Sequence, residues 1–330
     1  MVKFSIVITT FNRWEMLKRS LLSSLHQTMP CEVIVVDDHS SDRTEQNLQE
    51  LLIGYGNLFT YHRQPQNLGH AAAVNQGVNL ATGDWIKLVD DDDYLADNCI
   101  ETLSKIISAY TEDSQGSNHP KSSQNPQSSP AVICSTQAIQ VDENGQELSI
   151  TRTIGNAPVI SIDQADIHYG MLLELVPFGT PIQVAFRRDA FLQTGGWKSE
   201  LDTNYDDIDS WIKISQFGDA LFINQCLGYR TVWQGGLNQK FSILDRLKVN
   251  MKIKQQIYQL INSKYDRQLP SLNNVYKYLH LHWGLIALKQ KQFSTSLTLL
   301  FPALFSLPAW RLLLGRKNQQ EIAPQIYKIK

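Results

Sequence analysis

Short apolar runs alternate with helical segments over the first part of the chain, and this alternation constrains the fold more than any other feature. Three runs have the length and the branched side chains of buried strands: residues 4–8, 32–36 and 85–89. Three segments carry apolar or alanine residues at helical spacing: residues 14–25, 42–53 and 70–81. Strands that alternate with helices form a mostly parallel sheet with right-handed crossovers. The sequence therefore predicts an α/β fold.

Two of these strands run directly into aspartates. Asp37 and Asp38 follow the second strand, and the run Asp90–Asp93 follows the third. Ligands of open α/β sheets bind beyond the carboxyl ends of the strands. Two charges ~4 Å apart repel by about 4 kcal/mol at an effective dielectric of ~20, so converging carboxylates need a cation. An all-oxygen site suits Mg²⁺ or Mn²⁺. A solvated acidic loop that splays outward is the alternative interpretation.

The pattern changes beyond residue 110. Residues 111–130 are rich in serine, glutamine, asparagine and proline, which predicts a flexible surface insertion. Further elements are expected after it: strands at 131–135 and 182–186, a hairpin turn at Asn144-Gly145, and helices at 163–175 and 206–217. From about residue 241 only helical signals remain. We therefore expect an α/β domain over residues 1–240 and a helical region over 241–330.

Composition excludes several classes of protein. Thirty basic against 32 acidic residues give a net charge of −2, which provides no global field for binding nucleic acid. The four cysteines form no CxxC pair, so we expect reduced thiols in a cytoplasmic protein. The N-terminal apolar run is too short for a signal peptide, and no run reaches the ~20 apolar residues of a membrane span.

Four motifs occur in the order typical of one enzyme family: Ile6–Arg13, Val35–Asp42, Asn67–Gly77 and Gly83–Asp93. Together they resemble the inverting, nucleotide-sugar-dependent glycosyltransferases of family 2, which have the GT-A fold. The resemblance covers roughly residues 3–236. It implies a Rossmann-like, mostly parallel sheet flanked by helices, and transfer of a sugar from a nucleotide-diphosphate donor, UDP-sugar above all, to an acceptor hydroxyl with inversion.

The resemblance also assigns roles to individual residues. The nucleotide would be bound by these residues: Thr9, Phe11, Asn12, Arg13, Asp38, Asn67, Gly69, Asp90 and Asp91. Thr9 and Asp38 would hold the base. Asp92 would bind the divalent cation, Mn²⁺ or Mg²⁺, directly, and Asp90 would reach the ribose or a metal-bound water. Such a cation would neutralise the charge of the departing diphosphate.

A third acidic cluster precedes Trp211. The resemblance makes Asp207 the general base that takes the proton of the acceptor hydroxyl, with Asp206 and Asp209 as supporting carboxylates. These residues also suit a helix N-terminus, where each acid contributes about 0.3–1 kcal/mol. The two interpretations are compatible.

The chain departs from its relatives at two places. Many of them carry an Arg-x-His motif after the catalytic region, whereas the corresponding residues 229–234 here contain no histidine. A position that is often basic is occupied by Val74. Both departures concern the binding of the diphosphate.

Two questions stay open from the sequence. Residues 297–317 are apolar and end in cations, so they form either a packed tail that covers the catalytic domain or a peripheral membrane contact at the inner face of the membrane. A glycan or a lipid-linked acceptor in polysaccharide or cell-envelope synthesis is what the resemblance implies. The alternative function is a non-catalytic nucleotide-sugar-binding or scaffold protein with the same fold.

Overall fold

A computed structural model describes residues 2–55, 58–115, 129–198, 205–233, 241–315 and 325–326 of the chain. The chain forms two compact units. Unit 1 comprises Met1–Asp163, Phe178–Gln234 and Pro324–Lys330, and unit 2 comprises Gln164–Pro177 and Gly235–Ala323. The sequence assigned residues 164–177 to the first region, whereas they belong to unit 2.

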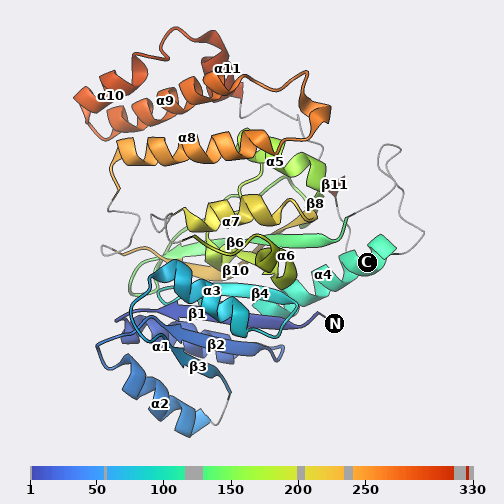
Figure 1. Cartoon of the computed structure of the whole chain (residues 1–330), viewed down its shortest axis with the longest axis vertical. Helices are drawn as coiled ribbons and strands as arrows, with labels where there is room; N and C mark the ends of the chain where they lie inside the picture. The colour runs from blue at the N-terminus through green and yellow to red at the C-terminus, as the bar shows by residue number, and fades with distance from the viewer. Residues whose placement is uncertain are drawn as a thin grey trace. The chain divides into compact units, whose positions relative to one another are not determined.

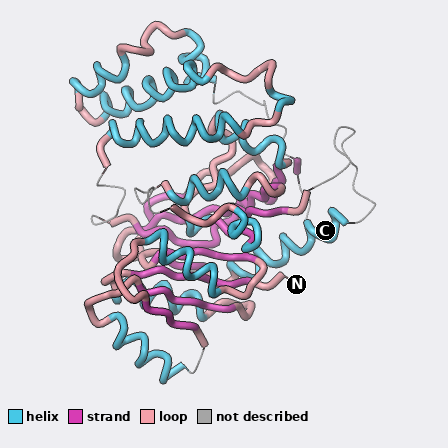
Figure 2. Tube along the Cα trace, in the orientation of Figure 1, coloured by secondary structure: helices cyan, strands magenta, loops and turns pink. Residues whose placement is uncertain are grey.

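Unit 1 contains the sheet (Figures 1 and 2). Its strands are β1 Phe4–Thr10, β2 Glu32–Asp37, β3 Thr60–Arg63, β4 Trp85–Asp90, β5 Tyr94–Leu95, β6 Ala131–Val141, β7 Glu147–Ile150, β8 Val159–Ile162, β9 Val184–Arg187, β10 Asp219–Thr231 and β11 Gln325–Ile326. The order is β11-β8-β10-β6-β9-β4-β1-β2-β3, with β5 paired to β10 and β7 to β6.

The sheet is mixed. The predicted parallel pairing holds for β3-β2-β1-β4 and for β6 with β10. Strand β9 lies antiparallel between β4 and β6 and so joins the two parallel parts. The predicted hairpin is confirmed: β6 and β7 pair antiparallel, and Gly145 has a φ of 82° in the turn.

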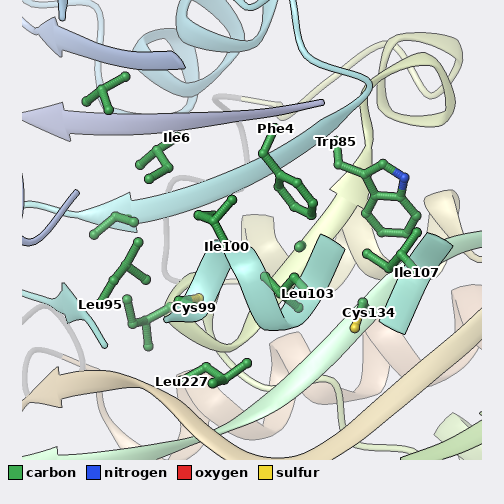
Figure 3. Packing of buried hydrophobic residues seen from close by; sticks show 14 of the residues in the cluster. Phe4, Ile6, Trp85, Leu95, Cys99, Ile100, Leu103, Ile107, Cys134 and Leu227 are labelled. Atoms are coloured by element: carbon green, nitrogen blue, oxygen red, sulfur yellow. The ribbon is translucent and has the colours of Figure 1, made fainter. Parts of the chain in front are cut away.

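The helices of unit 1 are α1 Trp14–Leu25, α2 Thr44–Tyr55, α3 His70–Leu80, α4 Cys99–Gln115, the 3₁₀ helix η1 Pro181–Gln183, α6 Arg188–Gln193 and α7 Asp206–Ile214. Alternation along β1 explains how they cover the sheet. Ile6 and Ile8 belong to one large core with Leu17 of α1 and Leu103 of α4. Figure 3 shows Ile6 and Leu103 in this core. The intervening Val7 faces the opposite way, towards α3.

Two long elements were not predicted. Helix α4 extends to Gln115, so residues 111–115 are helical and the expected insertion begins later; residues 116–128 lie outside the described part of the chain. Strand β10 spans 13 residues, and its register shifts twice between Ile223 and Gly228. The buried residues Ile100, Leu103 and Ile107 of α4 stand at helical spacing, so this helix was readable from the sequence. In β10 the register shifts break the alternation of a regular strand.

Unit 2 is helical. Its elements are α5 Gln164–Leu172, α8 Ile243–Gln259, the 3₁₀ helix η4 Ser263–Tyr265, α9 Leu272–Lys289, α10 Phe293–Leu300 and α11 Leu307–Gly315. The buried Lys254 of α8 donates hydrogen bonds of 2.8 Å to the carbonyls of Met171 and Leu172, which end α5. A cation on these carbonyls satisfies the C-terminus of α5 and explains why this segment packs with unit 2. Within the described residues, no helix is both long and apolar enough to span a bilayer.

The glycine at the end of the third motif is required by packing. A Cβ at Gly77 of α3 would lie 2.3 Å from Cγ1 of Val7, whereas a Cβ at Gly54 of α2 would meet nothing within 4 Å. We expect Gly77→Ala to lower the free energy of unfolding by roughly 1–3 kcal/mol through overpacking. Gly54→Ala should raise it by up to about 1 kcal/mol through helix propensity. Urea denaturation measures both; equal effects would contradict the proposed close approach of α3.

Candidate active site

The strand ends that carry the motifs meet at one edge of the sheet. Thr9 of β1 lies opposite Asp90 of β4, and Thr10 lies opposite Asp37 of β2. This is the juxtaposition that parallel pairing predicts, because the carboxyl ends of parallel strands share an edge. The acidic run therefore begins at the edge of the sheet where β1 and β2 end.

Two aspartates of the run are used to hold the loop. The buried carboxylate of Asp91 accepts a hydrogen bond of 2.8 Å from Oγ1 of Thr10 and lies 3.0 Å from the guanidinium of Arg13. The buried carboxylate of Asp93 accepts a 2.8 Å hydrogen bond from the backbone N–H of Thr231. These bonds tie the acidic loop to β1 and β10.

The other two aspartates have partners of a different kind. Nε2 of His70, the first residue of α3, lies 3.4 Å from Oδ1 of Asp90. Nε1 of Trp233 donates a 2.8 Å hydrogen bond to Oδ2 of Asp92. One oxygen each of Asp90, Asp92 and Asp93 lies within 4.8 Å of the others, so one cation can contact all three carboxylates.

The pKa values of these carboxyls reflect their crowding. Desolvation raises the pKa of Asp91 to about 6, against the opposing charge of Arg13. Desolvation and the charge of Asp90 raise the pKa of Asp92, and the pKa of Asp93 lies well above its ordinary value for the same reasons. At Asp90 desolvation is the largest single effect, but the hydrogen bond from His70 and the charges of His70, Arg230 and Arg13 together outweigh it and lower the pKa.

The carboxylates fit a divalent cation. Their mutual repulsion raises two pKa values, and an ion bound between them would relieve it. Carboxylate oxygens are the ligands that Mg²⁺ and Mn²⁺ prefer. The described cluster of Asp90, Asp92 and Asp93 thus supports a metal site, with Asp93 added to the pair expected from the sequence.

Arg19 of α1 supports the loop from behind. Its guanidinium donates hydrogen bonds to the carbonyl of Asp92 at 2.9 Å and to Oγ1 of Thr231 at 2.7 Å. It also lies 4.4 Å from the ring centre of Tyr94, which stacks on Tyr229 with centroids 4.5 Å apart. This cation fixes the backbone of the acidic loop from within the protein.

A chain of contacts connects the third motif to the acidic loop. The amide of Asn75 makes two 2.8 Å hydrogen bonds with the backbone N–H and carbonyl of Trp197. The Trp197 side chain is buried and meets His70 edge-on, with ring centroids 5.4 Å apart. Because His70 contacts Asp90, Asn75 is connected to the acidic loop through Trp197 and His70. Gly196 permits the turn, with a φ of 76° and only 2.4 Å between its would-be Cβ and Asn75.

The expected nucleotide-binding residues surround the same edge. Both carboxylate oxygens of Asp38 accept backbone hydrogen bonds of 2.8 Å, from Leu68 and Gly69. Each oxygen retains a second lone pair for a ligand. Oδ1 of Asn12 accepts a 2.7 Å hydrogen bond from the backbone of Ser41 and so connects the first two motifs.

The remaining expected residues differ in exposure. Thr9 is buried, whereas Phe11 is 42% exposed and Asn67 is exposed. The roles in nucleotide binding given to these residues, and to Asn12, Asp38 and the others, stay predictions.

The third acidic cluster forms the first turn of α7. Oδ1 of Asp207 accepts a 2.7 Å hydrogen bond from the backbone of Ile208. Desolvation chiefly raises the pKa of Asp207 to about 7, and the charge of Asp90 acts in the same direction. Asp206 is buried, and Asp209 forms an ion pair with Lys213 one turn later. The carboxyl of Asp207 is therefore electrostatically coupled to the acidic loop.

Three contributors to the site were not predicted: His70, Arg230 and Trp233. His70 directly follows Gly69 within the third motif, and this position was the only feature of the sequence that could have indicated its role. The charge of Arg230 contributes to the lowered pKa of Asp90 and opposes the rise in the pKa values of Asp93 and Asp207. Arg230 and Trp233 belong to the stretch in which the histidine of relatives is missing, so this stretch contributes a charge and an indole N–H instead.

A cavity of about 720 Å³ lies beside the acidic loop. Arg13 and Trp233 belong to its wall, and the arginine lies 5.2 Å from the centre of the indole ring. Arg43, Glu15 and Asp42 also line it, so its wall carries both signs of charge.

Comparison with known proteins identifies the family. Residues 5–194 match the sequence profile described as glycosyl transferase family 2. The chain belongs to this family. Its motifs and its GT-A fold are thereby accounted for, and the predicted fold class is confirmed.

Curated relatives of this family 2 chain match it in part. It is 31% identical over 134 residues to the poly(ribitol-phosphate) beta-N-acetylglucosaminyltransferase TarP of Staphylococcus aureus, covering 37% of this chain and 40% of TarP. It is 33% identical over 104 residues to the GalNAc(5)-diNAcBac-PP-undecaprenol beta-1,3-glucosyltransferase of Campylobacter jejuni, covering 31% and 34%. The chain thus spans two fifths or less of the length of these relatives.

Solved structures support the fold over nearly the whole chain. Residues 1–349 of S. aureus TarS in complex with UDP-GlcNAc align with a TM-score of 0.58 at 18% identity, covering 95% of this chain and 79% of that one. The mannosyltransferase PcManGT of Pyrobaculum calidifontis, in complex with GDP-Man and Mn²⁺, aligns with a TM-score of 0.54 at 18% identity and the same coverage.

The acidic loop predicts binding of a divalent cation. We expect Mn²⁺ to raise the melting temperature of the chain relative to EDTA, because an ion that binds the folded state stabilises it by mass action. Asp92→Asn should abolish most of this rise while keeping an oxygen that accepts the Trp233 hydrogen bond. Differential scanning fluorimetry measures the shift.

Asp97→Asn is the matched control. Asp97 is an exposed aspartate five positions along the chain from Asp92, outside the cluster of three carboxylates. It should respond to Mn²⁺ as the unmodified chain does. An equal response of all three proteins would rule out the acidic loop as the metal site.

Proposed function

We propose that this chain is an inverting glycosyltransferase that moves a sugar from a nucleotide-diphosphate donor to an acceptor hydroxyl. The observation that carries the proposal is the coupling of two acidic groups at one sheet edge. Asp90 and Asp92 belong to a cluster of carboxylates that can contact one cation. Desolvation chiefly raises the pKa of Asp207 to about 7, and the charge of Asp90 helps to raise it. A cation site and a base of suitable pKa are what a single displacement needs.

The acidic loop would hold the donor. Asp92 and Asp90 would hold the divalent cation, with Asp93 beside them, and the bound cation would neutralise charge on the departing diphosphate. Arg13 keeps Asp91 in place, and Trp233 orients the carboxylate of Asp92. His70 would orient Asp90 in the same manner, because it is itself fixed by Trp197.

Asp207 would activate the acceptor. Its carboxylate would take the proton of the acceptor hydroxyl as the hydroxyl oxygen forms its bond to the anomeric carbon. The bond between that carbon and the diphosphate oxygen breaks in the same step, and the nucleoside diphosphate leaves. One displacement inverts the configuration of the anomeric carbon. Desolvation helps here, because it makes Asp207 a stronger base than an exposed aspartate.

The donor nucleotide is proposed to be UDP. The aligned TarS structure contains UDP-GlcNAc, whereas the aligned PcManGT structure contains GDP-Man. The sequence matches favour the first, because TarP is named as an N-acetylglucosaminyltransferase and the Campylobacter relative as a glucosyltransferase. The names of both relatives also support a cell-envelope acceptor, either a polyol-phosphate polymer or a lipid-linked glycan.

We expect the purified chain with Mn²⁺ to release UDP from UDP-GlcNAc or UDP-glucose, and to release GDP from GDP-mannose at least about tenfold more slowly. Asp207→Asn should lower UDP release by two or more decades, because general-base help is worth roughly 10²–10⁴-fold. Its affinity for UDP should stay within about twofold, since the base acts on the acceptor and not on the nucleotide. Coupled UDP detection and calorimetry measure the two quantities.

Asp209→Asn is the control for this experiment. Asp209 lies in the same helical turn but is paired with Lys213, so its loss should change the rate far less. A fast Asp207→Asn variant beside a slow Asp209→Asn variant would transfer the role of base to Asp209. Absence of nucleotide release from every donor would favour a binding protein instead.

The pKa of Asp207 predicts a pH dependence. The base must be ionised, and its pKa is about 7 in the structure. A cation bound at Asp90 and Asp92 would lower that value. We expect kcat/KM to fall about tenfold per pH unit below a pKa at or below 7, and to level off above it. The residual rate of Asp207→Asn should not fall in this way at low pH. If it still falls, the titrating group is another residue.

A further inference from the structure

Unit 2 exposes a strip of large apolar side chains along α10 and the turn that follows it. The strip consists of Phe293 (66% exposed), Leu297 (70%), Phe301 (74%), Leu304 (42%), Phe305 (89%) and Leu307 (73%). We call these six residues the α10 strip. Exposed apolar residues are ordinary when they are scattered, but a contiguous group marks an interaction surface.

Helical spacing separates this strip from the side of α10 that is packed. Phe293, Leu297 and Phe301 follow one another at intervals of four residues and so share one face. The residues that face α9 lie between them: Leu299 and Ala303 belong to the core of unit 2. The tail is therefore packed against other helices of unit 2 on its inner side and is apolar on its outer side as well.

The charge of this region is of one sign. Residues 267–320 contain seven cations and no aspartate or glutamate: Arg267, Lys277, Lys289, Lys291, Arg311, Arg316 and Lys317. The rest of the chain then holds 23 basic against 32 acidic residues. Lys289 and Lys291 are exposed at the turn into α10, and Arg311 is exposed on α11. Cations thus lie next to the strip in the sequence on both sides.

We propose that the α10 strip binds the surface of an anionic lipid bilayer. Phenylalanine and leucine side chains would enter the boundary between headgroups and acyl chains, and the neighbouring lysines and arginines would contact lipid phosphates. Trp310, whose indole N–H donates a 2.8 Å hydrogen bond to the carbonyl of Leu304, is partly exposed beside the strip. A tryptophan with a satisfied N–H suits this boundary.

The charge pattern disfavours a second copy of the chain as the partner. A symmetric contact would place identical patches against each other, and each patch is flanked only by cations. An anionic bilayer has the complementary charge and also accepts the apolar side chains. This proposal does not depend on the proposed sugar transfer, because none of the residues of the acidic loop belongs to the strip.

The test is co-sedimentation of the full chain with vesicles. We expect binding to vesicles of phosphatidylglycerol and phosphatidylcholine, weaker binding at high salt, and much weaker binding to phosphatidylcholine alone. The double variant Phe301→Ser/Phe305→Ser should bind at least about tenfold more weakly, since it removes two inserting rings. Lys289→Gln, Lys291→Gln and Arg311→Gln should each weaken binding up to roughly fivefold.

Ile53→Ser is the matched control, because Ile53 is an 85% exposed apolar residue of α2 outside the strip. It should bind vesicles as the unmodified chain does. The melting temperature and nucleotide release of the double variant should be unchanged, since both rings are exposed and remote in sequence from the acidic loop. The proposal is overturned by absence of vesicle binding, by full binding of the double variant, or by a dimer in light scattering that the double variant abolishes.

Discussion

The repulsion among the carboxylates of Asp90–Asp93 is the constraint on which the site depends. Several elements around this run supply a positive charge or a hydrogen-bond donor. Arg13, at the N-terminal end of α1, pairs with a carboxylate, and Arg19 of α1 donates to a backbone carbonyl. Helix α3 contributes His70, and the end of β10 contributes Trp233. The compensation is incomplete, because the pKa values of three of the four carboxyls stay raised. The remaining charge is what a divalent cation would neutralise.

The four aspartates consequently divide into two kinds. Asp91 and Asp93 are buried and accept hydrogen bonds from Thr10 and Thr231, which fix the loop between β1 and β10, although Asp93 also has an oxygen in the cluster of three carboxylates. Asp90 and Asp92 are less buried and are oriented by side chains that themselves have little freedom. The residue between the two aspartates of the family motif therefore has a structural role in this chain. Without Asp91 and its partner Arg13, the loop would lose contacts that hold its backbone in place.

Unit 2 follows different physics. Its core is a small set of apolar residues between helices, and its buried Lys254 neutralises a helix end. Removal of this lysine from water lowers its pKa to about 7, and its ammonium group lies 2.8 Å from two carbonyl oxygens and 3.6 Å from the carboxylate of Glu174. The acidic loop of unit 1 holds four adjacent carboxylates, whereas residues 267–320 of unit 2 hold seven cations and no aspartate or glutamate. The loop therefore attracts cations, and this part of unit 2 attracts anions.

The sequence by itself determined the elements whose apolar period is simple and the order in which they run. β1, β2, β4 and the helices between them follow from their patterns, and parallel pairing then places Thr9 beside Asp90. Tertiary structure decided what depends on long-range pairing. Strand β10 crosses unit 1 with an irregular register, so no local signal could bring Trp233 to Asp92 or the charge of Arg230 to Asp207. The sequence gives the chemical type of each side chain, but the distance between two charges far apart in the sequence depends on how the strands pair.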